Sequence, residues 1–432
     1  MNEQITRICD SCLLLKIIQG GGRYLQHYVP QTYDINDQIQ IILVNSFQNN
    51  KNSSSIYAFT TQSNTCYVFN FVYDSIPYSI VLLSSIRCPL IFLKFLQDMR
   101  KTIENSKINN EENKIEPMVR MTLIWSILQS WHFIDKNEAV VTFSSTPFHA
   151  ILSSSYSQFS PFNFFSADTN YLQVWRTLLT GGRILIVSNG ATPKQMTYAT
   201  FGIASLSSEF PFSEKILLCQ NSQDPRLFDR ELIKEYKIIC APEMPNCFNP
   251  DDYDVTLQIQ MNKLPIDAFQ KIIQARNKRL YDIVSYLIQT NLISDPYSNF
   301  LEKDICDEYK AIINPETMEK ILNDKQFYDF THSGTFKSWR KDNLFNDEFR
   351  DAFLSTQPEV ALVNKTEEEL LKCSSFIDII KNHYSFDIHM VSVCKRHKKL
   401  IKRLLNGEKI EIQKPEPVVI SSFQLNCSSD EI

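Results

Sequence analysis

Glycine is scarce in this chain. Only nine glycines occur in 432 residues, whereas an average protein contains about 7% glycine. The motifs G-x-x-x-x-G-K-[ST] and G-x-G-x-x-G, which cradle phosphates on glycine-rich loops, are both absent. The sequence therefore predicts no nucleotide-binding loop of either kind. Five of the glycines fall in two clusters, Gly20 to Gly22 and Gly181–Gly182, which are typical of tight turns.

Long apolar runs and an excess of one charge are also lacking. The N-terminus, MNEQITRICDSC, has neither the basic region nor the apolar core of a signal peptide. No run of about 18 uncharged apolar residues occurs, so we expect a cytoplasmic chain that neither enters the secretory route nor spans a membrane. Charged residues make up 22% of the chain and the net charge is -5. Nucleic acid is therefore not an expected partner.

Motifs for metal binding are incomplete. Cys9 and Cys12 form a C-x-x-C, but no second pair stands at zinc-site spacing. The seven histidines are isolated and no H-E-x-x-H occurs. Asp251, Asp252 and Asp254 lack the glycine and the terminal glutamate of an EF-hand loop. We therefore expect no metal and no cofactor, and two ordinary thiols at the edge of a first strand.

Signals for covalent catalysis are equally weak. No G-x-S-x-G surrounds Ser153 to Ser155 or Ser84–Ser85, so no serine is presented as a nucleophile. The eleven cysteines are unevenly spaced, which favours reduced thiols in the core over a disulfide framework. The sequence predicts no catalytic residue.

Hydrophobic content of 43% in 432 residues predicts an α/β protein of two or three packed lobes, because a single core stops growing near 300 residues. Residues 1–104 are expected to form a small antiparallel sheet followed by a helix that begins at Pro89. The expected strands are Cys12–Ile18, Ile39–Phe47, Thr65–Tyr73 and Tyr78–Ser84.

Residues 105–135 are expected to join two lobes. The segment Glu104 to Glu116 is polar and has no hydrophobic period, which indicates a linker. Met118 to Trp131 carries apolar residues at helical spacing, so a bridging helix should follow.

Residues 136–261 are predicted to form a second α/β lobe. Strands are expected at Ala139–Phe143, Arg183–Ser188 and Lys237–Ala241, and helices at Tyr171–Leu179 and Lys194–Leu206. Because strands alternate with helices, this order indicates a mostly parallel sheet covered by helices.

Residues 262–406 read as helices alone, and residues 407–432 as a disordered tail. The expected helices are Pro265–Leu292, a segment around Met318–Leu322, Leu344–Phe353 and Glu367–Lys381.

A basic amphipathic helix precedes the tail. Its apolar residues Leu400, Ile401, Leu404 and Leu405 are interleaved with six cations, Lys395, Arg396, Lys398, Lys399, Lys402 and Arg403. Such a helix could contact an anionic membrane, because each cation near the surface contributes about 1 kcal/mol. The favoured interpretation is a solvated helix face, since a docked C-terminal helix also needs an apolar side.

Five segments, in order along the chain, resemble the DENN domain family. The central one is WRTLLTGGRILIV, Trp175 to Val187, in which a tryptophan-led helix ends at glycine and turns into a buried strand. The others are Tyr78 to Met99, similar to a longin-like module; Thr192-Pro193 with Phe201 to Leu206; Ile238, Ile239, Asn246 and Phe248; and Phe330, Ser333, Phe336, Trp339 and Arg340. The last group is most similar to the subgroup called DENN domain-containing protein 6. Gly182 and Arg183 stand where the family usually has an acidic residue and proline.

The resemblance implies three parts: a longin-like lobe, a central DENN lobe and a helical C-terminal region. It also implies a guanine-nucleotide exchange factor for a Rab-type small GTPase in membrane traffic, recruited to endosomal or other vesicle membranes. The GTPase would dock between the two α/β lobes, which makes Phe164, Asp168, Arg176 and Arg183 candidate contacts. Two alternatives stay open: a DENN-shaped scaffold that recruits a GTPase or regulator without exchange, and, with least support, a hydrolase or transferase.

Overall fold

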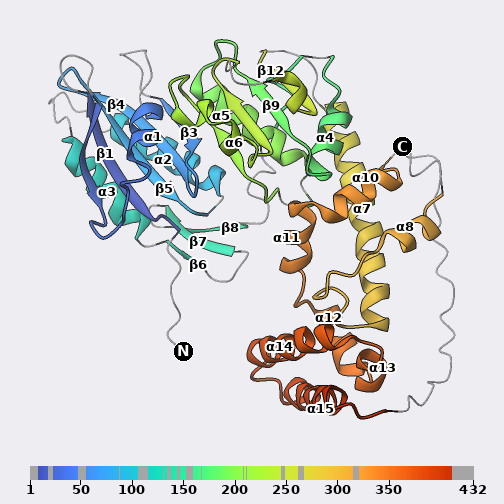
Figure 1. Cartoon of the computed structure of the whole chain (residues 1–432). Coiled ribbons are helices and arrows are strands. Elements are labelled where there is room, and N and C mark those ends of the chain that lie inside the picture. Colours follow the sequence, from blue (N-terminus) through green and yellow to red (C-terminus); the bar gives the residue numbers. More distant parts are fainter. Residues whose placement is uncertain are drawn as a thin grey trace. The chain divides into compact units, whose positions relative to one another are not determined.

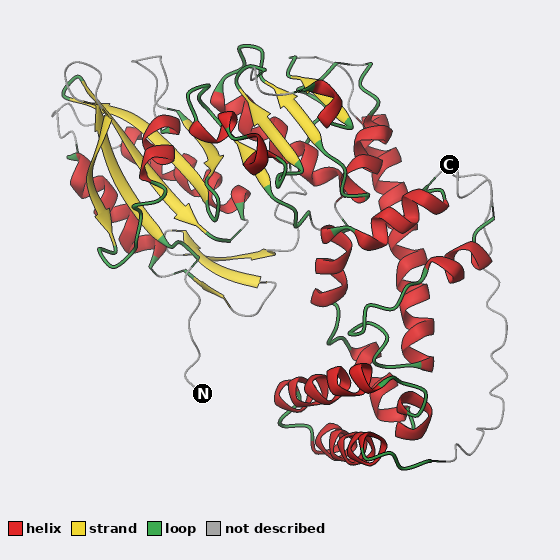
Figure 2. Cartoon of the chain, in the orientation of Figure 1, coloured by secondary structure: helices red, strands yellow, loops and turns green. Residues whose placement is uncertain are grey.

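The structure, a computed structural model, divides the chain into two compact units, residues 1–274 and 275–432. Helices and strands are distributed between them as Figures 1 and 2 show. The structure describes residues 8–410 apart from 18–22, 47–54, 87, 106–114, 130, 134–137, 144–145, 152–158, 167, 208, 211, 245–248, 261–266 and 315–320.

The first unit begins with a five-stranded antiparallel sheet. Its strands, in the spatial order β2-β1-β5-β4-β3, pair antiparallel throughout. They are β1 (Ser11–Ile17), β2 (Arg23–Val29), β3 (Ile56–Thr60), β4 (Thr65–Tyr73) and β5 (Ile76–Ser84). The predicted antiparallel sheet is confirmed, with β1, β4 and β5 close to their expected bounds. The strands β2 and β3 were not predicted.

Helices cover both faces of this sheet. One face packs on α1 (Ile39–Asn45), with Leu13 and Val68 in the same core cluster as Ile41 and Ile42. Alternate side chains of each strand point to the opposite face of the sheet. On that face Tyr67 stacks on Phe92 of α2 (Pro89–Asn105). The helix α3 (Pro117–Leu128) lies against β1. The helix after Pro89 and the helix near Met118 are therefore both present, while most of the expected linker lies outside the described residues.

The prediction of a strand at Ile39–Phe47 is wrong, because Ile39–Asn45 is the helix α1. Its buried residues Ile41, Ile42 and Asn45 lie at helical spacing, and the side chains of Asn45 and Ser46 donate to the carbonyls four residues earlier. A short apolar run does not distinguish strand from helix by itself. Tertiary packing decides between the two, because a helix at this position buries the apolar face of the neighbouring sheet.

Residues 132–151 form a separate three-stranded sheet in the order β6-β7-β8. The strands are β6 (His132–Phe133), β7 (Glu138–Phe143) and β8 (Thr146–Ile151), and all pairs are antiparallel. The strand expected at Ala139–Phe143 exists, but its assignment to the parallel sheet is wrong. Only two residues separate β7 from β8, and a parallel neighbour needs a crossover of a dozen or more.

A four-stranded parallel sheet completes the first unit, in the order β10-β11-β9-β12. Every pair runs parallel, which confirms the predicted type of sheet. Its strands are β9 (Ile184–Val187), β10 (Ile216–Leu218), β11 (Ile238–Ala241) and β12 (Val255–Gln258). The strands β10 and β12 were not predicted, because β10 has only three residues and β12, unlike β9 and β11, has a single buried residue.

Both faces of the parallel sheet are covered. Leu185 and Val187 pack on Leu227 and Ile233, which belong to η3 (Pro225–Phe228) and α6 (Arg230–Ile233). The helices α4 (Tyr171–Leu179) and α5 (Pro193–Ala204) lie against β9, β11 and β12 (Figure 1). Both helices were predicted, and α4 has the predicted bounds.

The second unit is built from helices, as predicted. They are α7 (Asp267–Ser294, which begins in the first unit), α8 (Cys306–Ile312), α10 (Asp324–His332), α11 (Gly334–Asp342), α12 (Asp347–Ser355), α13 (Pro358–Leu362), α14 (Glu367–His383) and α15 (Ile388–Leu405). Three of these correspond to the helices expected at 265–292, 344–353 and 367–381. The segment around Met318 and the tail beyond residue 410 lie outside the described residues.

Among the helices that the structure describes, none combines the length and the apolar character needed to cross a lipid bilayer. All nine described cysteines are buried and unpaired, which confirms for them the expectation of core thiols. Burial raises the pKa of Cys9 well above its ordinary value, and burial also raises the pKa of Cys12. Both thiols of the C-x-x-C therefore stay protonated at neutral pH.

Candidate functional site

The segment from α4 to β9 is built by local capping and one tight turn. Asn170 caps α4 by accepting the Gln173 N–H at 3.0 Å. Tyr171, Val174, Trp175 and Leu178, at helical spacing, are buried. Gly181 ends the helix with φ of 70°, a conformation that glycine adopts without strain. The chain then enters the buried strand β9 within three residues.

Gly182 lies in a space that admits no side chain. A Cβ atom there would stand 2.7 Å from Thr177 Cγ2 and 2.8 Å from Asp254 Oδ2. The same Oδ2 accepts the Arg183 N–H at 2.7 Å. Proline at 183 would have no N–H to donate. Gly182 and Arg183 thus both fit the Asp254 carboxylate of this chain.

The Arg183 side chain holds three elements together. Its guanidinium donates to the Asp252 carbonyl at 3.0 Å and to the Ile233 carbonyl at 3.1 Å. It also lies over the Tyr253 ring, 4.7 Å from the centroid. Arg183 therefore joins the start of β9 to α6 and to the loop before β12, which is a structural use of the side chain.

A hollow of about 400 Å³ opens between the start of α4 and the edge strand β12. Most of the residues that line it are of polar or charged type: Ser166, Asp168, Thr169, Asn170, Gln173, Val174, Asp254, Val255, Thr256, Leu257, Gln258 and Gln260. Two carboxylates and several amides and hydroxyls face this space. Such a lining can accept hydrogen bonds from the cationic or amide groups of a partner.

The four candidate contacts differ in their relation to this hollow. Asp168 is exposed and lines it. Phe164 is half-buried, and its carbonyl accepts the N–H of the lining residue Gln260 at 2.7 Å. Arg183 reaches the hollow only through Asp254, and Arg176 is a half-buried residue of α4. The structure thus places Asp168 in the hollow, places Phe164 next to it through the Gln260 backbone, and gives Arg183 a structural role.

The hollow is not at the junction of the two larger sheets. The junction is formed by their edge strands β3 and β10, whereas β12 is the opposite edge of the parallel sheet. Thr60 Oγ1 accepts the Leu218 N–H and lies within hydrogen-bonding distance of the Ile216 carbonyl, both at 2.9 Å. Thr197 Oγ1 accepts the Ala58 N–H at 2.9 Å. Hydrogen bonds through threonine hydroxyls therefore join β3 to its neighbours, in place of a continuous ladder of backbone hydrogen bonds between the sheets.

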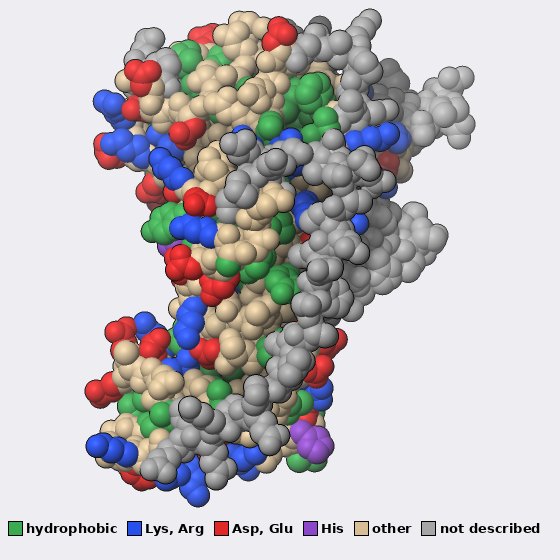
Figure 3. Space-filling model, turned by 90° about the vertical axis from the view of Figure 1, so that its right-hand side faces the viewer, with side chains coloured by type: hydrophobic (Ala, Val, Ile, Leu, Met, Phe, Trp, Pro, Cys, Tyr) green, Lys and Arg blue, Asp and Glu red, His purple; other side chains and the backbone are tan. Residues whose placement is uncertain are grey.

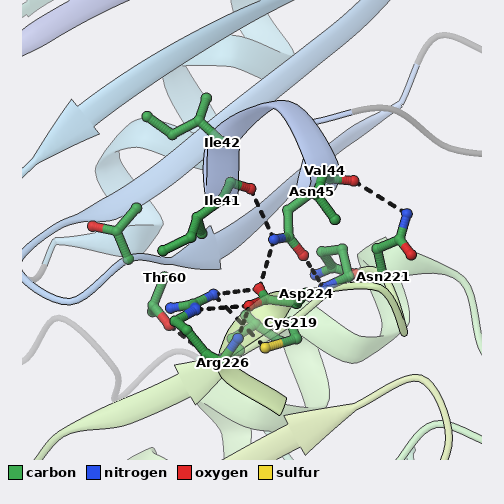
Figure 4. Close-up of polar contacts among 12 residues, drawn as sticks. Ile41, Ile42, Val44, Asn45, Thr60, Cys219, Asn221, Asp224 and Arg226 are labelled. Carbon is green, nitrogen blue, oxygen red and sulfur yellow. Dashed lines mark hydrogen bonds and ion pairs between the residues drawn. The ribbon is translucent and has the colours of Figure 1, made fainter. Parts of the chain in front are cut away.

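A buried polar cluster reinforces this junction (Figure 4). Asn45 Nδ2 donates to Asp224 Oδ2 at 2.7 Å, and Asn45 Oδ1 accepts the Gln220 N–H at 2.7 Å. Arg226 donates to both oxygens of Asp224, at 2.9 and 2.6 Å. Asn45, Asp224 and Arg226 are all nearly inaccessible. Burial alone would raise the pKa of Asp224, but hydrogen bonds from Arg226 and Asn45 hold it below its ordinary value.

This junction was not predicted from the sequence. Asn45 fell in a segment predicted as a strand, and nothing around Thr60 or Thr197 marks a contact between lobes. A local signal did exist at Asp224-Pro225-Arg226, where Asp224 caps the turn η3 by accepting the Arg226 N–H. Its partner Asn45 lies 179 residues away, so no local pattern could have identified it.

The late motif residues are structural as well. Phe330 and Phe336 are buried and contact each other edge to face, and Ser333 caps α11. Arg340 is buried and donates to the carbonyls of Ser298 and Lys303, both at 3.0 Å. Burial lowers the pKa of Arg340 to about 10. Asn246 and Phe248 lie outside the described residues.

Within the described residues, no three side chains of His, Cys, Asp or Glu gather as ligands for a metal ion. The acidic residues Asp252 and Asp254 have other roles. Asp254 accepts from Arg183, and the Asp252 carboxylate pairs with Arg230 at 3.3 Å.

No protein-family model matches the chain. A curated protein, the mitochondrial exoribonuclease II of Schizosaccharomyces pombe, is 29% identical over 118 residues. The matched part is 27% of this chain and 12% of that exoribonuclease. The similarity thus concerns a small fraction of the relative's length.

Proposed function

We propose that this chain is a guanine-nucleotide exchange factor for a Rab-type small GTPase. It would work in the cytoplasm and be recruited to endosomal or other vesicle membranes. The finer parts of the proposal are a longin-like lobe in residues 1–104, a linker and helix in 105–135, a central DENN lobe in 136–261, and a helical DENN-like region in 262–406.

The observation that carries the proposal is the order of elements in the first unit. An antiparallel sheet whose last strand leads directly into a long helix comes first, as a longin-like module would require. A parallel sheet containing the α4–glycine–β9 step follows. The DENN-like sequence segments described above occur in the same order, and the step at Trp175 to Val187 has the helix, turn and strand that the resemblance implies.

An exchange factor needs no covalent chemistry. It binds the nucleotide-free GTPase more tightly than the loaded form, and this difference in affinity weakens nucleotide binding. Nucleotide bound with picomolar affinity contributes about 16 kcal/mol, and each tenfold weakening requires about 1.4 kcal/mol of selective contact. A wide surface is required for this. The two sheets, joined by the buried β3–β10 junction, supply a rigid support for such a surface.

The resemblance places the GTPase between the two α/β lobes. The hollow beside Asp168, at the β12 edge away from the β3–β10 junction, is a further part of the contact surface that we assign to the GTPase. Asp168 and Asp254 give it two carboxylates, and the neighbouring loop exposes the polar side chain of Asn163. Carboxylates favour a partner segment that carries Lys or Arg.

The test is release of fluorescent GDP from a panel of Rab-type GTPases in the presence of the full chain. The proposal predicts faster release from at least one member. No acceleration across the full panel would contradict it. Stable binding to a GTP-loaded member without faster release would instead identify the alternative, a scaffold that recruits a GTPase or regulator without exchange.

A further inference from the structure

The exposed side of α15 combines unpaired cations with two very exposed apolar side chains at its start. The helix carries six Lys and Arg residues and no Asp or Glu. Lys398 pairs with Asp378, and Arg403 pairs with Glu408 at 2.7 Å. The other four, Lys395, Arg396, Lys399 and Lys402, are exposed and form no ion pair with a described residue. We call these four the cationic face.

The apolar side of the same helix is already occupied. Met390, Val393, Cys394, His397, Leu400 and Ile401 are buried within the second unit. The basic helix is therefore docked through its apolar side, as the favoured interpretation of the sequence expected. The opposite, cationic side is exposed. Figure 3 shows Lys and Arg side chains among those at the lower border of the molecule.

Phe386 and Ile388 stand at the start of this cationic side. They are 94% and 82% exposed, which is unusual for large apolar side chains that have a helical core nearby. At about 100° per residue, Ile388 lies within an arc of about 60° that also holds Lys395, Lys399 and Lys402. From Ile388 to Lys402 this row extends about 21 Å along the helix.

The turn that presents these two side chains is anchored. Asp387, between them, caps α15 by accepting the N–H groups of His389 and Met390. Arg350 of α12 donates to the Asp387 carboxylate at 2.8 Å. Phe386 and Ile388 are thus exposed in a turn whose conformation is fixed by hydrogen bonds of Asp387.

We propose that this side of α15 docks on an anionic lipid bilayer. The cationic face would lie on the headgroups, and Phe386 and Ile388 would enter the boundary between headgroups and acyl chains. A row of cations that pair with no described residue is complementary to anionic headgroups. Apolar side chains at the end of this row favour a surface that has an apolar layer beneath its charges. This proposal goes beyond exchange activity and does not depend on it.

The test is sedimentation of the full chain with two kinds of vesicle, phosphatidylcholine alone and phosphatidylcholine mixed with phosphatidylserine. Binding is expected only to the mixed vesicles and should weaken as salt is added. The triple variant Lys395→Glu, Lys399→Glu, Lys402→Glu should bind at least about a hundredfold less, because each cation near the surface contributes about 1 kcal/mol. The double variant Phe386→Ser, Ile388→Ser, which keeps every charge, should bind about tenfold less.

A matched control variant reverses the charge of three exposed lysines elsewhere in the same unit by substituting glutamate for Lys310, Lys325 and Lys341. It should bind like the unaltered chain, and thermal unfolding would verify that each variant is folded. Three results would overturn the proposal: no binding of the unaltered chain to mixed vesicles, equal loss in the control, or full binding by the double variant. Binding of single-stranded RNA through the same lysines, without vesicle binding, would also overturn it and would identify a nucleic-acid surface.

Discussion

Asn45 in the first sheet's covering helix donates a 2.7 Å hydrogen bond to Asp224, which belongs to the turn beside the parallel sheet. Both side chains are almost completely buried. The contact joins residues 179 positions apart and places a charged group inside the junction of two sheets. Several consequences can be measured.

Asp224→Ala should lower the free energy of unfolding by about 3–5 kcal/mol, because it leaves the buried Arg226 guanidinium without its carboxylate. Chemical denaturation of the full chain measures the loss. Asp251→Ala, at an exposed acid of the same unit, serves as the control and should change stability by less than about 0.5 kcal/mol.

The double variant Asp224→Ala, Arg226→Met separates the cost of an unpaired buried charge from the loss of packing at this junction. It should be more stable than Asp224→Ala alone, because removing the second charge relieves the unpaired group. If the double variant were the less stable of the two, the charge argument would be wrong and packing at Arg226 would dominate.

Gly182→Ala should destabilise the α4–β9 turn by about 1–3 kcal/mol, since the new Cβ meets Thr177 and Asp254. Gly190 provides a comparison, because its φ is +85° and no atom lies within 4 Å of an added Cβ. Alanine there should cost about 1–2 kcal/mol from backbone strain alone. Adding Asp254→Ala to each variant distinguishes the mechanisms by denaturation: only at position 182 should it recover part of the loss.

Acid should destabilise the second unit through His397, which is fully buried and has its Nδ1 2.7 Å from the Tyr297 hydroxyl. Burial lowers the pKa of His397 to about 4, whereas an unfolded histidine has a pKa of about 6.5. Between these values the unfolded chain binds the proton and the folded chain does not. Stability is therefore full above about pH 6.5 and falls by up to about 3 kcal/mol as the pH approaches 4.

Urea unfolding at neutral pH and near pH 5 measures this dependence. His397→Gln should reduce it, since glutamine does not titrate, whereas His389→Gln, at an exposed position, should leave it unchanged. An equal pH dependence in His397→Gln and in the unaltered chain would rule out His397 as its source.

Asp168→Lys should reduce stimulated GDP release at least about tenfold if the hollow beside α4 receives a cationic segment of the GTPase. The substitution is at an exposed side chain, so the unfolding temperature should not change. Asp37→Lys makes the same change of charge at another exposed position of the first unit and should retain full activity. Normal exchange by Asp168→Lys would remove the hollow from the proposed contact surface.

Local chemistry made parts of the fold predictable. The helix α4 was placed at its observed bounds, where buried residues at helical spacing end at a glycine. The helix α5 was placed within two residues of its observed bounds, and the structure shows Thr192 and Pro193 at its start. Long strands such as β4 and β5 were recognisable from their apolar runs. The strand β10 has only three residues and β12 has a single buried one, so neither gave such a signal. The apolar run of α1 is one that strand and helix share.

The candidate site was predicted less well. Of the candidates near α4, Asp168 lines the hollow, whereas Arg183 uses its guanidinium to hold the Asp252 and Ile233 carbonyls. The sequence does not show whether an arginine in a turn binds a partner or the backbone of its own chain. Only the positions of the Asp252 and Ile233 carbonyls in the structure distinguish these two roles.

The sequence by itself determined which segments become helices or strands wherever caps, glycines and apolar periods act within a few residues, and it determined that the last third is helical. The tertiary structure decided the strand order, the antiparallel pairing of β7, the helical state of Ile39–Asn45, and the Asn45–Asp224–Arg226 cluster. The reason is physical. Capping and periodicity are short-range and can be read in order along the chain, whereas burial and the pairing of buried polar groups depend on residues brought together from distant positions.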